Sequence, residues 1–113
     1  MLNGLKSGEY VEFYRLKQNN NNTVNSSHVG GSNNYALADH TFVEGLNNVS
    51  SNEGEAVFGK FNKPEANALL SVGNGTGNSD RKNAFTVLDN NSIKIGNTIL
   101  TEAQLKSLLA LIQ

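Results

Sequence analysis

The chain has 113 residues, of which 37% are hydrophobic, against a usual apolar share of about 45–50%. One domain of this composition buries little apolar surface by itself, so we expect it to oligomerise. Nine basic and ten acidic side chains leave a net charge of −1, which removes the electrostatic source of nucleic-acid binding. The absence of cysteine excludes disulfides and thiolate metal sites, and no apolar run approaches the ~20 residues of a membrane span.

Residues 1–26 are predicted to form an N-terminal strand and an asparagine-rich connector. Aromatic and branched side chains alternate with polar ones in Glu9–Lys17, which is typical of a strand that caps an open sheet edge. The tract Asn19–Asn22 has no packing side chains, and we expect a flexible connector or a turn there. Met1–Leu16 has no uninterrupted apolar stretch, so we do not expect it to act as a signal peptide.

A fourteen-residue repeat organises residues 27–77. Its glycines are Gly31, Gly45, Gly59 and Gly73, and a valine stands two residues before the first three, at Val29, Val43 and Val57. Fourteen residues fit two short strands and two turns, which is one coil of a parallel β-solenoid. The glycines would permit left-handed backbone or close approach of coils, and the valines would stack in the interior. Asparagines recur after the glycines, at positions 33, 34, 47, 48 and 62, and predict repeated turns.

A β-hairpin region is predicted over residues 78–100. Two strands, Ala84–Asp89 and Ser92–Ile95, flank Asn90–Asn91, a pair suited to a type I′ turn. One buried face of this hairpin would hold Phe85, Val87, Ile93 and Ile95. A second turn at Gly96–Asn97 would lead into a strand over Thr98–Leu100.

A helix is predicted over residues 101–113, because Thr101 and Gln104 form an N-cap and capping-box pair. It would run to about Ile112, and it is too short to be stable alone. We expect it to associate with partner copies rather than to pack on the hairpin, and the predicted trimer interface consists of Leu105, Leu108, Leu109 and Ile112.

The repeat resembles the head repeats of YadA-like trimeric adhesins and, more closely, the Ser-His-Ala-Glu-Gly repeats of phage tail proteins. The resemblance covers about residues 27–100. Its repeats are the segments 27–31 (SHVGG), 41–45 (TFVEG) and 55–59 (EAVFG), and the segments 59–62 (GKFN), 72–76 (VGNGT) and 80–85 (DRKNAF) resemble the end of such repeat regions in tail fibres. It implies a mainly β fold, with short parallel β-solenoid or β-roll coils, a hairpin and a C-terminal α-helix, assembled as an intertwined homotrimer.

The function implied by the resemblance is structural and adhesive. The chain would belong to a phage tail fibre or receptor-binding protein in the virion, with itself, other tail or surface proteins and a host glycan or protein receptor as partners. The alternatives are a head segment of a bacterial surface adhesin and a purely structural trimerisation or connector module.

An enzyme is the rival from another class, and we do not expect one. His28 and His40 could join Asp39 or Glu44 in a metal site, and Ser27 could be a nucleophile, but no nucleophile elbow or oxyanion-forming helix accompanies them. The loop at residues 73–77 lacks the lysine of a phosphate-binding loop. We therefore predict no catalytic, cofactor or metal residues. Five of the eight aromatic residues could form a receptor-binding surface but are expected in the core: Tyr10, Tyr14, Tyr35, Phe42 and Phe58.

Overall fold

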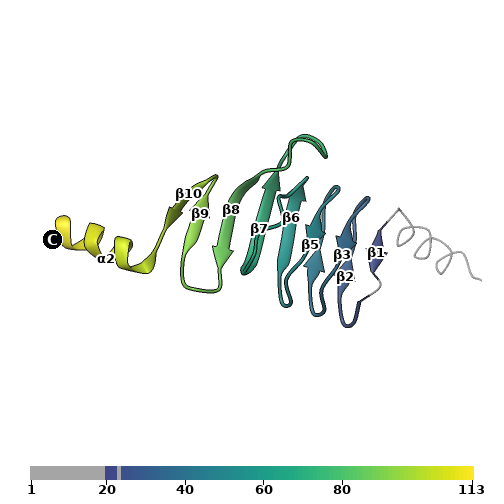
Figure 1. Cartoon of the computed structure of the whole chain (residues 1–113), viewed down its shortest axis with the longest axis horizontal. Coiled ribbons are helices and arrows are strands. Elements are labelled where there is room, and N and C mark those ends of the chain that lie inside the picture. The colour runs from purple at the N-terminus through teal and green to yellow at the C-terminus, as the bar shows by residue number, and fades with distance from the viewer. Residues whose placement is uncertain (1–19, 23) are drawn as a thin grey trace, which may run out of the picture.

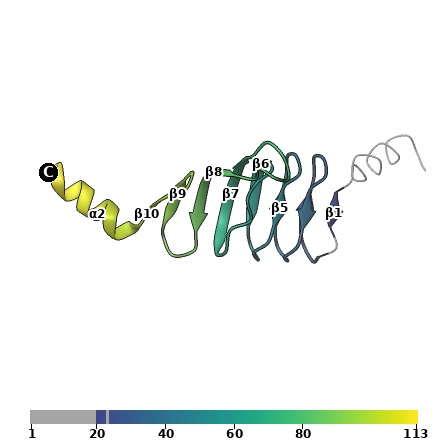
Figure 2. The same ribbon diagram turned by 45° about the horizontal axis from the view of Figure 1, so that its top comes forward.

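The computed structural model describes residues 20–22 and 24–113, which form an elongated, mainly β structure of 69 × 28 × 23 Å. Short strands follow one another along the long axis, and a helix stands at the C-terminal end (Figure 1). Figure 2 shows the same succession after a 45° turn. The strand predicted over Glu9–Lys17 lies outside the described residues.

The described strands form two sheets. The three-stranded sheet has the order β1-β3-β5, and the seven-stranded sheet has the order β10-β9-β8-β7-β6-β4-β2. The strands of the first part of the chain are β1 (Asn21–Asn22), β2 (His28–Val29), β3 (Tyr35–Ala36), β4 (Phe42–Val43), β5 (Val49–Ser50), β6 (Ala56–Lys60) and β7 (Ala68–Asn74). Because β1 to β6 alternate between the sheets, the chain crosses both sheets once in each fourteen-residue unit, which we call a coil.

Parallel pairing keeps the same fourteen-residue offset throughout. His28 lies opposite Phe42, Phe42 opposite Ala56, and Ala56 opposite Leu70. In the other sheet Tyr35 lies opposite Val49. The interval found between the glycines is therefore also the interval at which strands pair.

Asn21–Asn22 corrects the prediction of a flexible connector over Asn19–Asn22. These two residues form β1, which pairs in parallel with Tyr35–Ala36. Asparagine has a low strand propensity, but here the preceding Asn20 side chain accepts a hydrogen bond from the Asn34 backbone N–H at 3.0 Å. This contact with the next coil holds the segment in register.

The interior of the coils is narrow and contains small side chains. In each two-residue strand from β2 to β4, one residue points outward and the other is buried. Val29, Val43 and Val57 form one buried column, which Ser71 continues in β7. A second buried column consists of Ala36 and Ser50 in the other sheet.

Antiparallel strands follow the coils, and the hairpin prediction is confirmed. β8 (Asn83–Leu88) pairs with β7 and with β9 (Ile93–Ile95), which in turn pairs with β10 (Thr98–Leu100). The predicted type I′ turn is wrong, because only Asn91 of the Asn90–Asn91 pair has a positive φ, of 67°. A longer loop closes the hairpin, and the Leu88 N–H donates to the Ser92 carbonyl.

The predicted buried face of this hairpin is also wrong. Phe85 pairs with Ile95, and Val87 pairs with Ile93, so the four side chains share one face. Ile95 is nevertheless 67% exposed, and the other three are only partly buried. Within the described part of a single chain, no further layer covers this face. The buried side chain of β8 on the opposite face is Thr86.

The helix prediction is confirmed. α2 (Glu102–Leu111) begins after Thr101, whose hydroxyl accepts from the Gln104 N–H at 3.2 Å. The Gln104 side chain accepts from the Thr101 N–H at 2.9 Å, so both parts of the capping box are present.

Candidate oligomerisation site

The helix α2 presents its apolar side chains to solvent. Among the described residues, nothing packs on α2 closely enough to bury any of its side chains. Leu105, Leu108 and Leu109 are 44%, 51% and 46% exposed, and Ile112 is 79% exposed. Isolated helices of this length are marginal in water, so burial of these exposed leucines would stabilise α2.

Two shallow grooves connect the helix to the last strands. The first is lined by Leu100, Leu108 and Leu111, together with Ala103, Gln104 and Ser107. The second lies between strand and helix and is lined by Ile93, Leu100 and Leu105, together with Asn91, Thr101 and Glu102. Because Leu100 lines both grooves, the apolar surface of α2 is continuous with the end of the seven-stranded sheet.

The repeat glycines lie where neighbouring coils approach most closely. Gly31, Gly45 and Gly59 have φ of 76°, 118° and 90°, in the left-handed region that favours glycine. A Cβ on any of the three would overlap the carbonyl oxygen of the glycine fourteen residues later. Gly73 has an ordinary φ, but a Cβ there would crowd the backbone of Asn62 at 2.7 Å.

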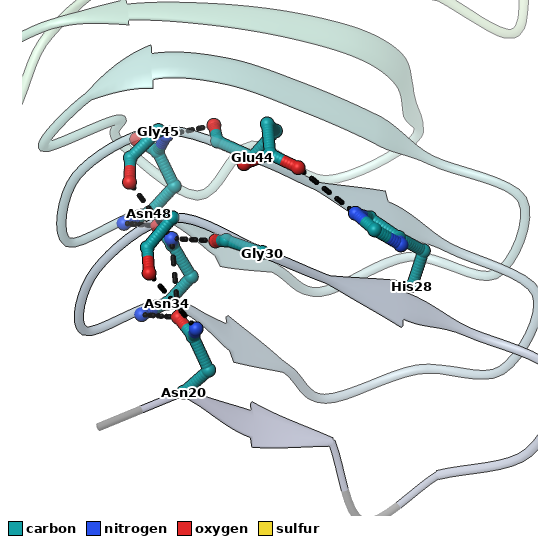
Figure 3. Close-up of polar contacts among 8 residues, drawn as sticks. Asn20, His28, Gly30, Asn34, Glu44, Gly45 and Asn48 are labelled. Carbon is teal, nitrogen blue, oxygen red and sulfur yellow. Dashed lines mark hydrogen bonds and ion pairs between the residues drawn. The ribbon is translucent and has the colours of Figure 1, made fainter. Parts of the chain in front are cut away.

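A column of asparagines, half-buried at Asn20 and fully buried at its other positions, joins the coils (Figure 3). The Oδ1 of Asn34 accepts from the Asn48 N–H at 2.8 Å, and the Oδ1 of Asn48 accepts from the Asn62 N–H at 3.2 Å. The Nδ2 of Asn48 donates to the carbonyls of Glu44 and Gly59 at 2.8 and 2.9 Å. We call this column, Asn20, Asn34, Asn48 and Asn62, the asparagine ladder.

Sequence reasoning treated the recurring asparagines as turn residues and missed the ladder. The prediction fits Asn33 and Asn47, which have φ of 60° and 53°, but Asn34 and Asn48 are fully buried. The signal was present as a fourteen-residue spacing that begins at Asn20, before the first repeat glycine.

Glu55 is a buried acid that immediately precedes β6. It is 1% exposed, and its carboxylate accepts from the backbone N–H groups of Ser51 and Asn52 at 2.9 and 3.2 Å. The Ser71 hydroxyl donates to it at 3.1 Å. Desolvation raises the pKa of Glu55 above its ordinary value, and these three hydrogen bonds oppose the rise only in part.

The two histidines bind separate carboxylates. His28 Nε2 lies 2.8 Å from Glu44 Oε2 (Figure 3), and His40 Nδ1 lies 3.2 Å from Glu53 Oε2. Asp39 accepts from the Asn25 N–H at 2.9 Å. Across residues 20–22 and 24–113, no three His, Asp or Glu side chains are grouped closely enough to hold a metal ion.

The described aromatic residues named above are not in the core, which corrects that expectation. Tyr35, Phe42 and Phe58 are 45%, 41% and 39% exposed. The reason is the narrow interior of the coils, which is filled by valine, alanine, serine and asparagine. Large rings therefore remain on the outer faces. Tyr10 and Tyr14 lie outside the described residues.

Comparisons with known proteins give no guide to the site. No family model matches the chain, and no curated protein or solved structure is significantly similar to it. Of the helices in the described ranges, none is long and apolar enough to cross a membrane.

Proposed function

We propose that the chain is a short parallel β-solenoid that assembles as a homotrimer through its C-terminal helix. In this role it is a structural and adhesive module of a phage tail fibre or receptor-binding protein. Three copies display the same outer surface, so weak contacts with a host glycan or protein receptor add up to stronger attachment.

The observation that carries this proposal is the uncovered apolar surface of α2 and the adjoining grooves. A helix of ten residues with Leu105, Leu108 and Leu109 nearly half exposed gains stability when copies bury those leucines against one another. Leu105 and Leu108 are three residues apart and Ile112 follows four later, which is the spacing of a coiled-coil seam.

The coils support the mechanical part of the proposal. Each coil contacts its neighbours through parallel strand pairs and the asparagine ladder. Such stacking resists extension along the long axis, which is the direction in which a fibre bears load.

The experiment compares Leu108→Asp with Ala110→Asp. Both substitutions add one negative charge at an exposed position in the second half of α2. Leu108 lies in the coiled-coil seam, whereas Ala110 lies on the face of the helix that points away from it. Light scattering on the wild-type protein should give about 36 kDa, three times the 12.1 kDa of one chain. Leu108→Asp should lower trimer stability by roughly several kcal/mol, because three carboxylates would be buried near one axis.

The control, Ala110→Asp, should leave the mass at that of the trimer. A stable wild-type monomer of 12.1 kDa would refute the proposed assembly. Equal effects of the two substitutions would show that the helix does not associate through Leu108. The receptor itself is best sought by applying the purified trimer to a glycan array.

A further inference from the structure

We infer that the three-stranded sheet is closed to further strands at its β5 edge, because side chains occupy the backbone groups with which a strand of another copy would pair. The consequence is that copies cannot join end to end through this sheet. The inference does not depend on the proposed homotrimer, since it concerns growth along the strand-pairing direction and not association through α2.

The bonds that carry this sheet from β3 to β5 are backbone bonds. The Tyr35 N–H donates to the Asn48 carbonyl at 2.8 Å, and the Leu37 N–H donates to the Ser50 carbonyl at 3.0 Å. The corresponding donors fourteen residues later are the N–H groups of Val49 and Ser51, but the sheet ends at β5. An edge strand ordinarily presents such groups unpaired, which makes the edge a template for another strand.

Side chains take the place of the missing strand. The Val49 N–H donates to Asn62 Oδ1 at 2.7 Å, and the Val49 carbonyl accepts from Asn62 Nδ2 at 2.9 Å. The Ser51 N–H donates to the Glu55 carboxylate at 2.9 Å. Asn62 and Glu55 are 0% and 1% exposed, so water does not compete freely for these bonds. The Asn62 side-chain amide therefore acts on Val49 as the peptide group of a neighbouring strand would.

Asn62 departs from the pattern of the asparagine ladder to do this. In the preceding coil, Asn48 Nδ2 donates forward to the Gly59 carbonyl at 2.9 Å. Asn62 Nδ2 instead donates back to Val49. The Asn62 carbonyl, which the repeat would pair with the Val49 N–H, accepts from Arg81 Nη1 at 3.1 Å. The last asparagine of the ladder thus ends the sheet and does not lead into another coil.

The position of the next strand is blocked as well. Lys63 and Pro64 lie fourteen residues after Val49 and Ser50, and they form no strand. The Lys63 N–H donates to Asn83 Oδ1 at 2.8 Å, and the Lys63 carbonyl accepts from Asn83 Nδ2 at 2.7 Å. Pro64 has no N–H to donate. Lysine and proline are typical of protected sheet edges, and a second asparagine amide here occupies the backbone that a strand would need.

The other sheet ends in a different way, which makes the β5 edge the place where protection is required. The seven-stranded sheet continues beyond the coils through β8, β9 and β10. Parallel stacking at a constant interval is a head-to-tail arrangement, and such contacts between copies grow into open filaments when an end accepts the next copy. Sealing the β5 edge removes that route of growth.

The test compares Asn62→Ala with Asn48→Ala in the full chain. Both asparagines are fully buried members of the ladder. Asn62→Ala removes the two bonds to Val49, but it keeps the bond from the Asn62 N–H to Asn48. Asn48→Ala removes three side-chain bonds and leaves the contacts between Asn62 and Val49 in place, so it is the control for lost stability. Circular dichroism checks that each variant folds, and light scattering gives the mass at rising protein concentration.

We expect the mass of Asn62→Ala to rise with concentration to at least about twice that of wild type, while Asn48→Ala keeps the wild-type mass. Equal masses for all three proteins would overturn the inference. An equal rise in both variants would overturn it too, since lost stability alone would then explain the association.

A second pair of variants decides the matter if either buried substitution prevents folding. Asn83→Ala frees the backbone N–H and carbonyl of Lys63, whereas Asn90→Ala changes an exposed loop position. We expect only Asn83→Ala to associate beyond the wild-type mass, and no difference between the two would overturn the inference. The wild-type mass is the reference in each comparison, so a monomeric wild-type protein would refute the homotrimer and leave this test unchanged.

Discussion

The coils and the C-terminal part of the molecule differ in how far they bury their side chains within one chain. In residues 20–74, the parallel strands pair at an interval of fourteen residues, and buried valines, asparagines and serines fill the interior. In residues 83–113, the buried side chains are Asn83, Thr86 and Ser92, and no apolar side chain is fully buried. The first region has its own interior, whereas the second leaves its apolar side chains on the surface.

The difference shows what each region requires. The coils depend on short-range complementarity between one coil and the next, so a fault in one coil disturbs its immediate neighbours. In the proposed trimer, the C-terminal part depends on a surface that another copy supplies. Substitutions in the coils should therefore act on the fold itself, whereas those in α2 should act on association.

The largest expected effect is that of Gly45→Ala in the coils. Gly45 has φ of 118°, and an added Cβ would overlap the Gly59 carbonyl oxygen, which is backbone and cannot move aside. Strain and overlap together should destabilise the fold by more than about 4 kcal/mol. Urea unfolding followed by circular dichroism measures the change.

Gly54→Ala is the matched control for backbone strain. Gly54 has φ of 79°, but the space around it is open for 4 Å. It should cost about 1 kcal/mol, the strain of a left-handed residue with a Cβ. If both substitutions cost the same, close approach of the coils is not what requires glycine at position 45.

The next effect is that of Asn48→Ala in the asparagine ladder. The substitution removes the Asn48 side chain from the Asn62 N–H and from the Glu44 carbonyl, and it leaves the Gly59 carbonyl with the Leu46 N–H as its remaining donor. We expect a loss of about 3 kcal/mol in the free energy of unfolding. Asn90→Ala, at an exposed loop position, should change stability by less than about 0.5 kcal/mol. A loss below about 1 kcal/mol for Asn48→Ala would mean that water replaces the ladder contacts.

Features signalled by neighbouring residues could be predicted from the sequence. The capping box of Thr101 and Gln104 and the hairpin around Asn90–Asn91 are local patterns, and both elements form. The fourteen-residue interval was visible because the glycines mark it and strand pairing follows it. Each of these signals reports on backbone conformation near the residues that carry it.

Features that depend on a neighbouring coil could not be predicted in the same way. Asn21–Asn22 has poor strand propensity, yet it pairs with β3 because the next coil supplies its partner. Glutamate is typically a surface residue, but Glu55 is buried and accepts hydrogen bonds from Ser51, Asn52 and Ser71. The outward position of Phe42 and Phe58 follows from the narrow interior, and amino-acid type alone suggested the opposite.

The smallest expected effect is the pH dependence that Glu55 gives to the stability of the coils. Burial raises the pKa of this carboxyl, so the unfolded chain releases the proton at lower pH than the folded chain does. Stability from this group is therefore fully present below the ordinary pKa and falls as pH rises toward the folded-state value. The fall amounts to ~1.4 kcal/mol for each pH unit that separates the pKa of the folded chain from that of the unfolded chain.

Glu55→Gln tests this dependence, because glutamine keeps an acceptor for Ser51 and Asn52 but cannot ionise. The stability of the variant relative to wild type should increase between about pH 4 and pH 7 in urea unfolding. Glu53→Gln, which removes an exposed carboxylate two residues away, is the control for the loss of one charge. A difference that is flat or decreases with pH would mean that the hydrogen bonds from Ser51, Asn52 and Ser71 outweigh the desolvation of Glu55.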